Sequence, residues 1–394
     1  MRHLIAALII TTAAPALADD TSTSALIASK GLAAARTAIE AEAASPDRDM
    51  ALAAVTFLGG IESAYQHRWT VGLTEIPVAF PVIGTPLNPN PSPDPLTADY
   101  LNRIASDLGT AMQATRSVLP EDGGDGAIVL NLSDIWFDVD MNGVRDGSEG
   151  LLTLAGFPQN GGEGAPSDAV RFDTADLHWL RAYTHLIEGS MTLIRAFDPE
   201  PEIARALSLR EAIRSQFAGS GAPEGEMPGY FDWEMAADAA SVVINTLRQQ
   251  PDPTLVAEAE EHLRAMIAAN SDFWAAVATE TDNDREWIPN DAQQQALGLE
   301  VPQGAGAAWI EVLADAEQVL DGELLIPYWR FAPGHGINLR KWLDAPAPID
   351  LIDWIQGTAA LDYADEGALI EGDAWSQFVS ITGGNAGLYM VLFN

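Results

Sequence analysis

The sequence predicts a mainly α-helical fold with long connections rich in proline and glycine. Apolar and alanine-rich segments repeat at a spacing of three to four residues, which places their side chains on one face of a helix. Strand-like patterns are confined to Glu323–Phe331 and Ser376–Thr382. With 394 residues, 47% of them hydrophobic, the chain can bury a sizeable core as one large domain, or as two that share an interface.

The first expected helices span residues 24–44 and 48–68. Ser45-Pro46-Asp47 lies between them, and this triplet ends one helix and starts the next. Residues 76–95 are rich in proline, so we expect an extended, polyproline-like segment there. The next helix covers residues 98–119 and is followed by a glycine-rich break.

The most regular helical pattern follows an N-cap at Asp173 and runs to Phe197. Apolar residues cover more than half of its circumference, which is typical of a central, buried helix. Its remaining stripe is polar and holds His178, Arg181, His185, Glu188, Thr192 and Arg195. Further helices are expected at residues 202–218, 232–249, 254–280 and 305–320, about eight to twelve in total.

The N-terminus has the pattern of a secretory signal peptide. Arg2 and His3 precede a short apolar run, and Ala16-Leu17-Ala18 offers a small-x-small cleavage site near Ala18. We therefore expect residues 1–18 to be removed, which leaves residues 19–394 as one domain with a possible division near residues 158–170. No later segment approaches the ~20 apolar residues of a membrane span, so membrane insertion is not expected. These features predict a periplasmic protein, or alternatively one released to the medium.

The chain is strongly acidic, with 57 Asp and Glu against 20 Lys and Arg and a net charge of −37. Such a charge repels nucleic acids and anionic membranes, so neither is expected as a partner. Divalent cations are favoured, although most of the acidic residues are expected only to keep the surface soluble. The chain has no cysteine, so disulfides and a lipid-anchoring cysteine are excluded.

Residues 138–149, with the sequence Asp-Val-Asp-Met-Asn-Gly-Val-Arg-Asp-Gly-Ser-Glu, have the ligand spacing of an EF-hand-type calcium loop. Oxygen-bearing side chains occupy the first, third, fifth and ninth positions, glycine the sixth and glutamate the twelfth. Ca²⁺ prefers six to eight oxygen ligands, and the glycine permits the sharp bend that this loop needs. The expected metal ligands are Asp138, Asp140, Asn142, Val144 through its carbonyl, Asp146 and Glu149.

The loop resembles those of EF-hand and dockerin proteins, and also single Asp-rich loops in secreted bacterial repeat domains. It departs from the paired EF-hand in two respects. Its eighth position, where an apolar residue normally pairs with a second loop, is Arg145, and the sequence has no second loop of this kind. Gly147, Gly150 and Gly156 also disfavour a long exiting helix. Both departures favour a solitary structural site over a sensor.

Residues 280–290 suggest an alternative, a secreted hydrolase acting on polysaccharide or cell wall. Asp282, Asp284 and Glu286 are the candidate catalytic carboxylates, with His335 further along the chain. Carboxylates beside tryptophans suit glycan chemistry, because indoles stack on sugars and carboxylates transfer protons. An Asp-rich turn is also an ordinary helix end, and no other catalytic motif accompanies it, so catalysis is the less favoured interpretation.

A second alternative is a transition-metal site on the helix after Asp173. His185 and Glu188 are three residues apart and resemble the His-x-x-Glu motif of imelysin-like periplasmic metal proteins. His178 lies ~10 Å of helical rise away from His185, too far for one ion to take both. The competing interpretation is a stripe of buried hydrogen bonds and ion pairs between helices.

The chain as a whole resembles uncharacterised secreted bacterial proteins with a calcium loop ahead of two further motifs. The matching stretches are residues 179–185 (Trp-Leu-Arg-Ala-Tyr-Thr-His) and residues 280–290. This resemblance implies no activity. The leading hypothesis is therefore a periplasmic, mainly helical calcium-binding protein with one structural site, for which the sequence specifies no protein or glycan partner.

Overall fold

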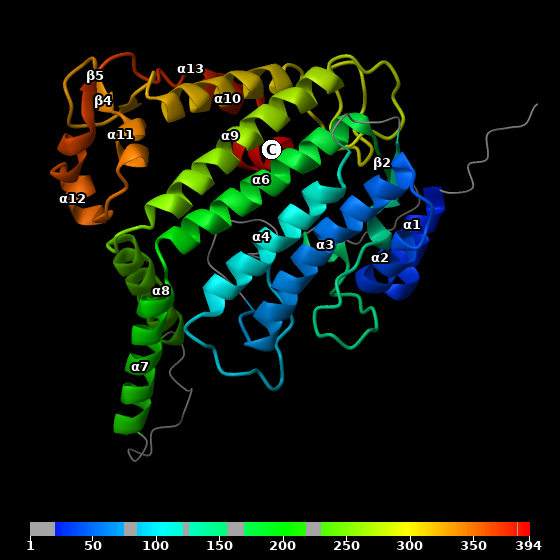
Figure 1. The fold of residues 1–394 in the computed structure, drawn as a ribbon, viewed down its shortest axis with the longest axis horizontal. Helices are drawn as coiled ribbons and strands as arrows, with labels where there is room; N and C mark the ends of the chain where they lie inside the picture. The colour runs from blue at the N-terminus through cyan, green and yellow to red at the C-terminus, as the bar shows by residue number, and fades with distance from the viewer. Residues whose placement is uncertain (1–19, 75–84, 121–125, 156–168, 218–229, 384) are drawn as a thin grey trace, which may run out of the picture.

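A computed structural model confirms the mainly α-helical fold (Figure 1). It describes residues 20–74, 85–120, 126–155, 169–217, 230–383 and 385–394. These residues form α1 (Asp20–Lys30), α2 (Leu32–Glu40), α3 (Pro46–Thr70), α4 (Tyr100–Val118), β1 (Ile128–Asn131), η1 (Leu132–Asp134), α5 (Leu151–Leu154), β2 (Ala169–Phe172), α6 (Thr174–Ala196), α7 (Glu200–Phe217), α8 (Tyr230–Leu247), α9 (Pro253–Val277), α10 (Ala305–Asp321), β3 (Ile326–Pro327), β4 (His335–Ile337), α11 (Leu339–Asp344), α12 (Leu351–Gln356), η2 (Ala359–Tyr363), β5 (Ala364–Glu366), α13 (Asp373–Ile381) and α14 (Ala386–Phe393), where η marks a 3-10 helix.

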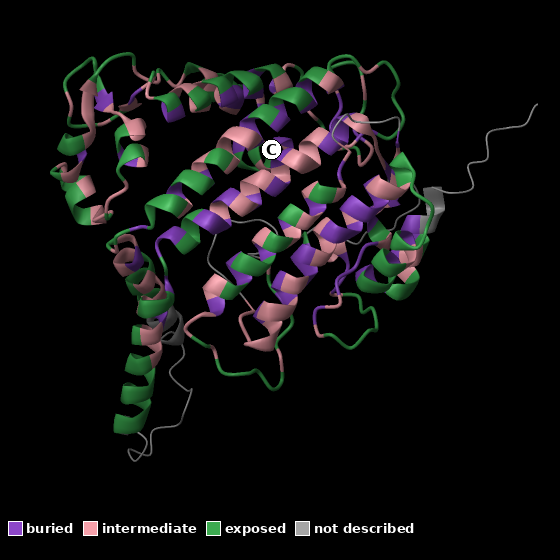
Figure 2. Ribbon diagram, in the orientation of Figure 1, coloured by how far each residue is buried: buried purple, intermediate pink, exposed green. Residues whose placement is uncertain are grey.

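Four long helices, α3, α4, α6 and α9, lie side by side and form the centre of the molecule (Figure 1). α6 packs between α4 and α9, as its wide apolar surface predicted, and buried residues follow the packed faces of these helices (Figure 2). The C-terminal part of α6 is less enclosed, because Leu193 and Ile194 are exposed. The helix is therefore central along most of its length but not at its end.

Local caps determine where α6 begins. The Asp173 side chain accepts a hydrogen bond from the Ala175 backbone N–H at 3.1 Å, and the Asp176 side chain accepts one from the Asp173 N–H at 3.0 Å. This reciprocal arrangement satisfies backbone donors that the first helical turn leaves without a partner. The predicted N-cap is confirmed.

Two antiparallel sheets connect the helices. β1 pairs with β2, with Ile128 opposite Phe172, so the segment that leads to residues 138–149 lies beside the segment that leads into α6. β3, β4 and β5 form a three-stranded sheet at the end of the molecule that also holds α11 and α12 (Figure 1). The strand expected over residues 323–331 is therefore reduced to β3.

The other predicted strand, Ser376–Thr382, is wrong, because these residues lie in and directly after α13. Trp375, Phe378 and Val379 have helical spacing, and the buried Phe378 ring packs on Trp309 of α10 with 5.1 Å between ring centroids. A short apolar run fits either element by periodicity alone, and the packing against α10 selects the helix. The first predicted helix is also divided, since Gly31 adopts a φ of 77° between α1 and α2.

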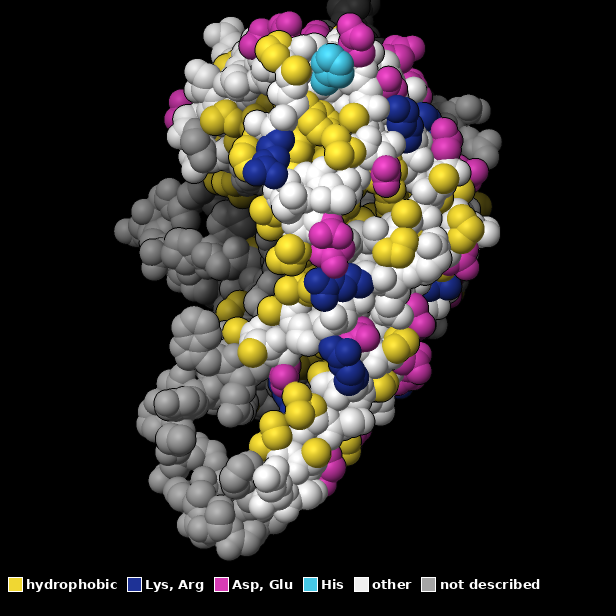
Figure 3. Space-filling model, turned by 90° about the vertical axis from the view of Figure 1, so that its left-hand side faces the viewer, with side chains coloured by type: hydrophobic (Ala, Val, Ile, Leu, Met, Phe, Trp, Pro, Cys, Tyr) yellow, Lys and Arg dark blue, Asp and Glu magenta, His cyan; other side chains and the backbone are white. Residues whose placement is uncertain are grey.

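Several expectations fall wholly or partly outside the described residues: the signal peptide at 1–18, the proline-rich segment at 76–84 and the proposed division near 158–168. Residues 85–95 are described and contain neither helix nor strand, as expected. No described helix has the length together with the apolar character that crossing a lipid bilayer requires. On the face drawn in Figure 3, acidic and basic side chains are interspersed without a continuous basic patch.

Candidate metal centres

Residues 138–149 form a loop whose two ends are held together by backbone hydrogen bonds. Phe137 N–H donates to the Glu149 carbonyl at 3.0 Å, and Leu151 N–H donates to the Ile135 carbonyl at 2.9 Å. The helix that follows, α5, has only four residues. The long exiting helix of a paired EF-hand is therefore absent here, in agreement with the glycines of this segment.

Three of the predicted ligands converge inside this loop. Asp138, Asp140 and Glu149 each offer a carboxylate oxygen, and these oxygens lie within 4.8 Å of one another. The Gly143 N–H donates to both Asp138 oxygens at 3.1 Å, with Gly143 at a φ of 72°. Glycine adopts this left-handed conformation without the steric penalty of a Cβ. The loop therefore brings its first, third and twelfth positions together.

The other predicted ligands lie in the same loop and shape its turns. Asn142 Oδ1 accepts from the Val144 N–H at 2.6 Å, and Asp146 Oδ1 accepts from the Ser148 N–H at 2.7 Å. Asn142 Nδ2 donates to Asp140 Oδ2 at 2.8 Å. Asp146 does not belong to the group of three carboxylates, and the ninth position of such loops often reaches its ion through water.

Helix α3 contributes two contacts that the motif does not include. Glu62 Oε2 accepts from the Asp138 N–H at 2.8 Å, and Gln66 Nε2 donates to the Asp138 carbonyl at 2.8 Å. The pKa of Glu62 is raised to about 7, chiefly by burial; the hydrogen bond from the Asp138 N–H opposes this shift, and the charges of Asp138 and Glu149 add to it. Burial likewise raises the pKa of Glu149. A further carboxylate therefore lies beside the loop, from a residue that precedes Asp138 by 76 positions.

Arg145, the departure at the eighth position, is directed back to the start of the loop. Its guanidinium donates to the Ser133 carbonyl. On the other side, Asn88 Nδ2 donates to Ser148 Oγ at 2.7 Å. Both contacts are made within this chain. Arg145, at the position that would pair with a second loop in a paired EF-hand, therefore holds its own loop against η1.

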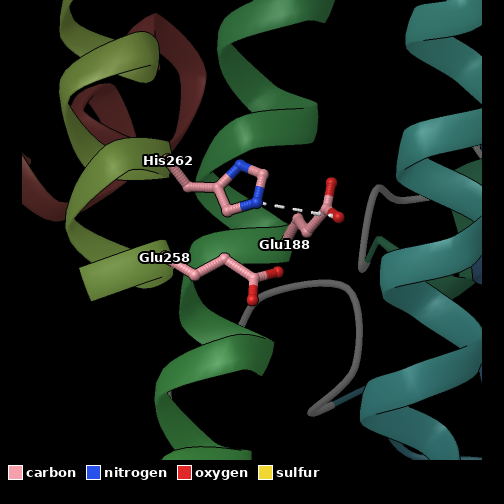
Figure 4. A group of neighbouring side chains, drawn as sticks. All are labelled: Glu188, Glu258 and His262. Carbon is pink, nitrogen blue, oxygen red and sulfur yellow. Dashed lines mark ion pairs between the residues drawn. The ribbon is translucent and has the colours of Figure 1, made fainter. Parts of the chain in front are cut away.

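A second group of metal-ligating side chains lies between α6 and α9 (Figure 4). Glu188 comes from α6, and Glu258 and His262 come from α9, with one ligand atom of each within 4.8 Å of the others. Glu188 Oε2 accepts from the Arg116 guanidinium of α4, while Glu188 Oε1 lies 3.7 Å from His262 Nε2. The two α9 residues were missed from sequence because nothing local in Glu258-x-x-x-His262 distinguishes it from a solvated helix face.

His185, the other half of the predicted His-x-x-Glu pair, is not a member of this group. Its Nδ1 lies 2.9 Å from Nδ1 of His262. Burial lowers the pKa of His185 to about 3, and the charges of Arg116, His262 and Arg181 act in the same direction. The structure therefore places His185 behind His262, as a neutral hydrogen-bonding partner.

The candidate catalytic residues are only partly brought together. Asp282 and Asp284 are exposed, whereas Glu286 is buried and accepts from the Asp284 N–H at 2.7 Å. Asp282 Oδ2 lies 3.8 Å from Nη1 of Arg171. His335 lies in β4, at the opposite end of the molecule from this loop (Figure 1). The three carboxylates are neighbours, and the histidine does not join them.

Beside this loop lies a cavity of about 330 Å³ between α3, β1, α6 and α14. Trp179, Tyr183 and Trp287 line it together with aliphatic side chains, and Asp176 contributes the one ionisable acid of the lining. Sugars need several hydrogen-bonding groups, so this apolar cavity gives the glycan hypothesis no support.

No protein family, curated protein or solved structure matches the chain. The two metal-ligating groups are therefore the features from which its function is inferred.

Proposed function

We propose that this protein is an exported calcium-binding protein in which residues 138–149 hold one Ca²⁺ in a structural role. The observation that carries the proposal is the convergence of Asp138, Asp140 and Glu149, with the left-handed Gly143 donating to Asp138. Ca²⁺ is a hard cation that takes oxygen ligands, and a bidentate glutamate at the twelfth position is typical of such loops. Asn142, the Val144 carbonyl and Asp146 would complete the set.

The electrostatics of the loop also favour a bound cation. Glu62 adds a buried carboxylate beside the three that converge in the loop, and the Arg145 guanidinium is directed at a carbonyl rather than at these acids. Like charges at such short range oppose one another, and a divalent cation converts this repulsion into attraction. When bound, Ca²⁺ would hold the loop closed against α3.

The architecture supports a structural site rather than a sensor. A sensor opens a groove between paired helices, whereas here α5 has four residues and Arg145 donates to the Ser133 carbonyl of η1, in the segment that leads into the loop. Extracellular calcium modules bind with a Kd of roughly 10⁻⁴–10⁻³ M. At ten times Kd the linkage stabilises the folded state by about 1.4 kcal/mol, which suffices to order a local loop.

Export is part of the proposal. The basic tip, apolar run and Ala16-Leu17-Ala18 site of the first 18 residues support cleavage near Ala18, and the periplasm is the expected compartment. The absence of a membrane-spanning helix among the described residues is compatible with this location.

Direct calcium binding tests the proposal. Isothermal titration of the mature chain should give one Ca²⁺ per chain, and Glu149→Ala should abolish the binding because the twelfth position supplies two oxygens. Glu42→Ala, which removes an exposed carboxylate before α3, is the matched control and should bind as the wild type does. Equal binding by the Glu149 variant, or no binding by the wild type at millimolar calcium, would refute the proposal.

A further inference from the structure

The two carboxylate oxygens of Glu188 have different neighbours. Oε2 accepts a hydrogen bond from the Arg116 guanidinium, and Oε1 lies 3.7 Å from His262 Nε2. This distance is too long for a hydrogen bond. It is close to the ~3.4 Å that separates two ligand atoms bound about 2.1 Å from one tetrahedral ion. Both side chains are only 14% exposed, so this gap lies inside the helical bundle.

The contact between the two histidines couples the protonation of their ring nitrogens. At 2.9 Å, one Nδ1 must donate and the other accept. If His185 donates, His262 Nε2 carries a proton that finds no acceptor within reach at Glu188. If His262 donates, its Nε2 has a lone pair directed at the Glu188 oxygen, and these two acceptors then need a cation between them.

The second arrangement matches the surroundings of metal-bound histidines. A ligating imidazole almost always donates its other N–H to a nearby acceptor, which fixes the ring. His185 is placed to be that acceptor, because its Nδ1 lies 2.9 Å from Nδ1 of His262. Arg181 itself donates to the Pro120 carbonyl at 2.9 Å, so it leaves the His185 ring free to accept.

Glu258 supplies the third ligand. It precedes His262 by one helical turn, and its carboxylate lies on the side of α9 that faces Glu188 (Figure 4). It is exposed, so an ion bound there would keep a position open to water. Gly189 allows this approach of α6 to α9, since a Cβ there would lie 2.9 Å from Cβ of His262.

We propose that Glu188, Glu258 and His262 form a second metal centre that binds a divalent transition ion such as Zn²⁺. An imidazole with two carboxylates suits such an ion, whereas Ca²⁺ prefers oxygen alone. Glu188 and Glu258 supply two carboxylates, and Arg116 donates to only one oxygen of Glu188. His185 is a positioning residue that orients His262, which revises the His185–Glu188 pair predicted from sequence.

Binding of Zn²⁺ and Co²⁺ to the mature chain tests this centre, with Ca²⁺ in excess so that the first loop is saturated. We expect one Zn²⁺ per chain by calorimetry and a Co²⁺ visible spectrum with a nitrogen ligand. His262→Ala and Glu258→Gln should abolish both signals, and His185→Ala should weaken affinity about 10- to 100-fold, as is typical when an outer hydrogen bond to a ligand is lost. Glu261→Gln, an exposed neighbour on α9, is the matched control.

Circular dichroism of each variant establishes that the fold is retained, and exposed Glu258 is the substitution least able to disturb it. Unchanged Zn²⁺ affinity in Glu258→Gln and His262→Ala, or no Zn²⁺ binding by the wild type, would overturn the proposal. Glu149→Ala should bind Zn²⁺ as the wild type does, so the two centres can fail independently.

Discussion

Glu62 shows how a single side chain outside the motif can support the proposed calcium loop. It lies on α3, is buried, and accepts the N–H of Asp138 at 2.8 Å. Without it, that backbone donor would lose its partner at the first position of the loop. The loop is therefore anchored to helix α3, which lies far from it in the sequence.

Glu62→Ala should lower the free energy of unfolding by about 1–3 kcal/mol, the cost of leaving a buried donor unsatisfied. Glu62→Gln retains an acceptor oxygen and should lose clearly less. Urea unfolding in saturating calcium measures both. If the two variants are equally stable, the hydrogen bond to Asp138 does not anchor the loop.

Glu280 predicts a pH dependence of stability. Burial raises its pKa to about 7, as do the charges of Asp173, Glu286 and Asp282, against a hydrogen bond from Gln293. Between the ordinary glutamate pKa and this value the folded state holds a proton that the unfolded state has lost. Stability contributed by this group is therefore full at low pH and falls as pH rises toward 7.

Glu280→Gln removes the loss of stability that accompanies ionisation of Glu280. The variant should be more stable than the wild type at pH 8, by about 1 kcal/mol after discounting for solvent screening at a partly exposed site. At pH 4.5 the two proteins should be similar. Urea unfolding of both proteins at both pH values measures how the stability difference between variant and wild type changes with pH. A stability difference that is the same at pH 4.5 and pH 8 would contradict this account.

At the scale of elements, the contact between α6 and α9 is the most consequential. Gly189→Ala places a Cβ 2.9 Å from His262 Cβ and should destabilise the protein by about 1–3 kcal/mol through overpacking. Gly59→Ala, in α3 with no atom within 4 Å of the new Cβ, should instead stabilise by up to about 1 kcal/mol through helix propensity. Thermal unfolding compares them, and a neutral Gly189 variant would show that the helices do not need this close approach.

The starts of helices that carry an N-cap residue in the sequence were predicted closely. Ser45 caps α3 by accepting from the Arg48 N–H, and Asp252 caps α9 by accepting from the Thr254 N–H. Both helices begin within two residues of their predicted starts. β4, β5 and helices α11, α12 and α14 were not foreseen, and part of α13 was predicted as a strand, because their short apolar runs acquire a definite structure only from packing.

The same distinction holds for the two metal-ligating groups. The convergence of Asp138, Asp140 and Glu149 could be predicted because these residues belong to one loop and their spacing is visible in the sequence. Glu62 and His262 reach their sites through helix packing across 76 and 74 positions, counted to Asp138 and Glu188. Contacts between residues so far apart leave no pattern in the local sequence from which they could be predicted.

Considered as a whole, the molecule is an acidic helical bundle with a proposed calcium loop held against α3 and a second proposed metal centre between α6 and α9. The net charge of −37 favours cations in general but selects neither site. Selection comes from geometry, because within the part of the chain that the structure describes two groups of acidic and histidine side chains bring their ligand atoms within 4.8 Å of one another. The loop is proposed to stabilise the fold, and that is the central claim.

The free energy of unfolding as a function of free calcium tests this claim most directly. In urea denaturation the wild type should gain about 1.4 kcal/mol at ten times Kd and continue to rise logarithmically. Glu149→Ala should show no dependence on calcium, while Glu42→Ala should follow the wild type. Identical wild-type stability in EGTA and in millimolar calcium would contradict the account.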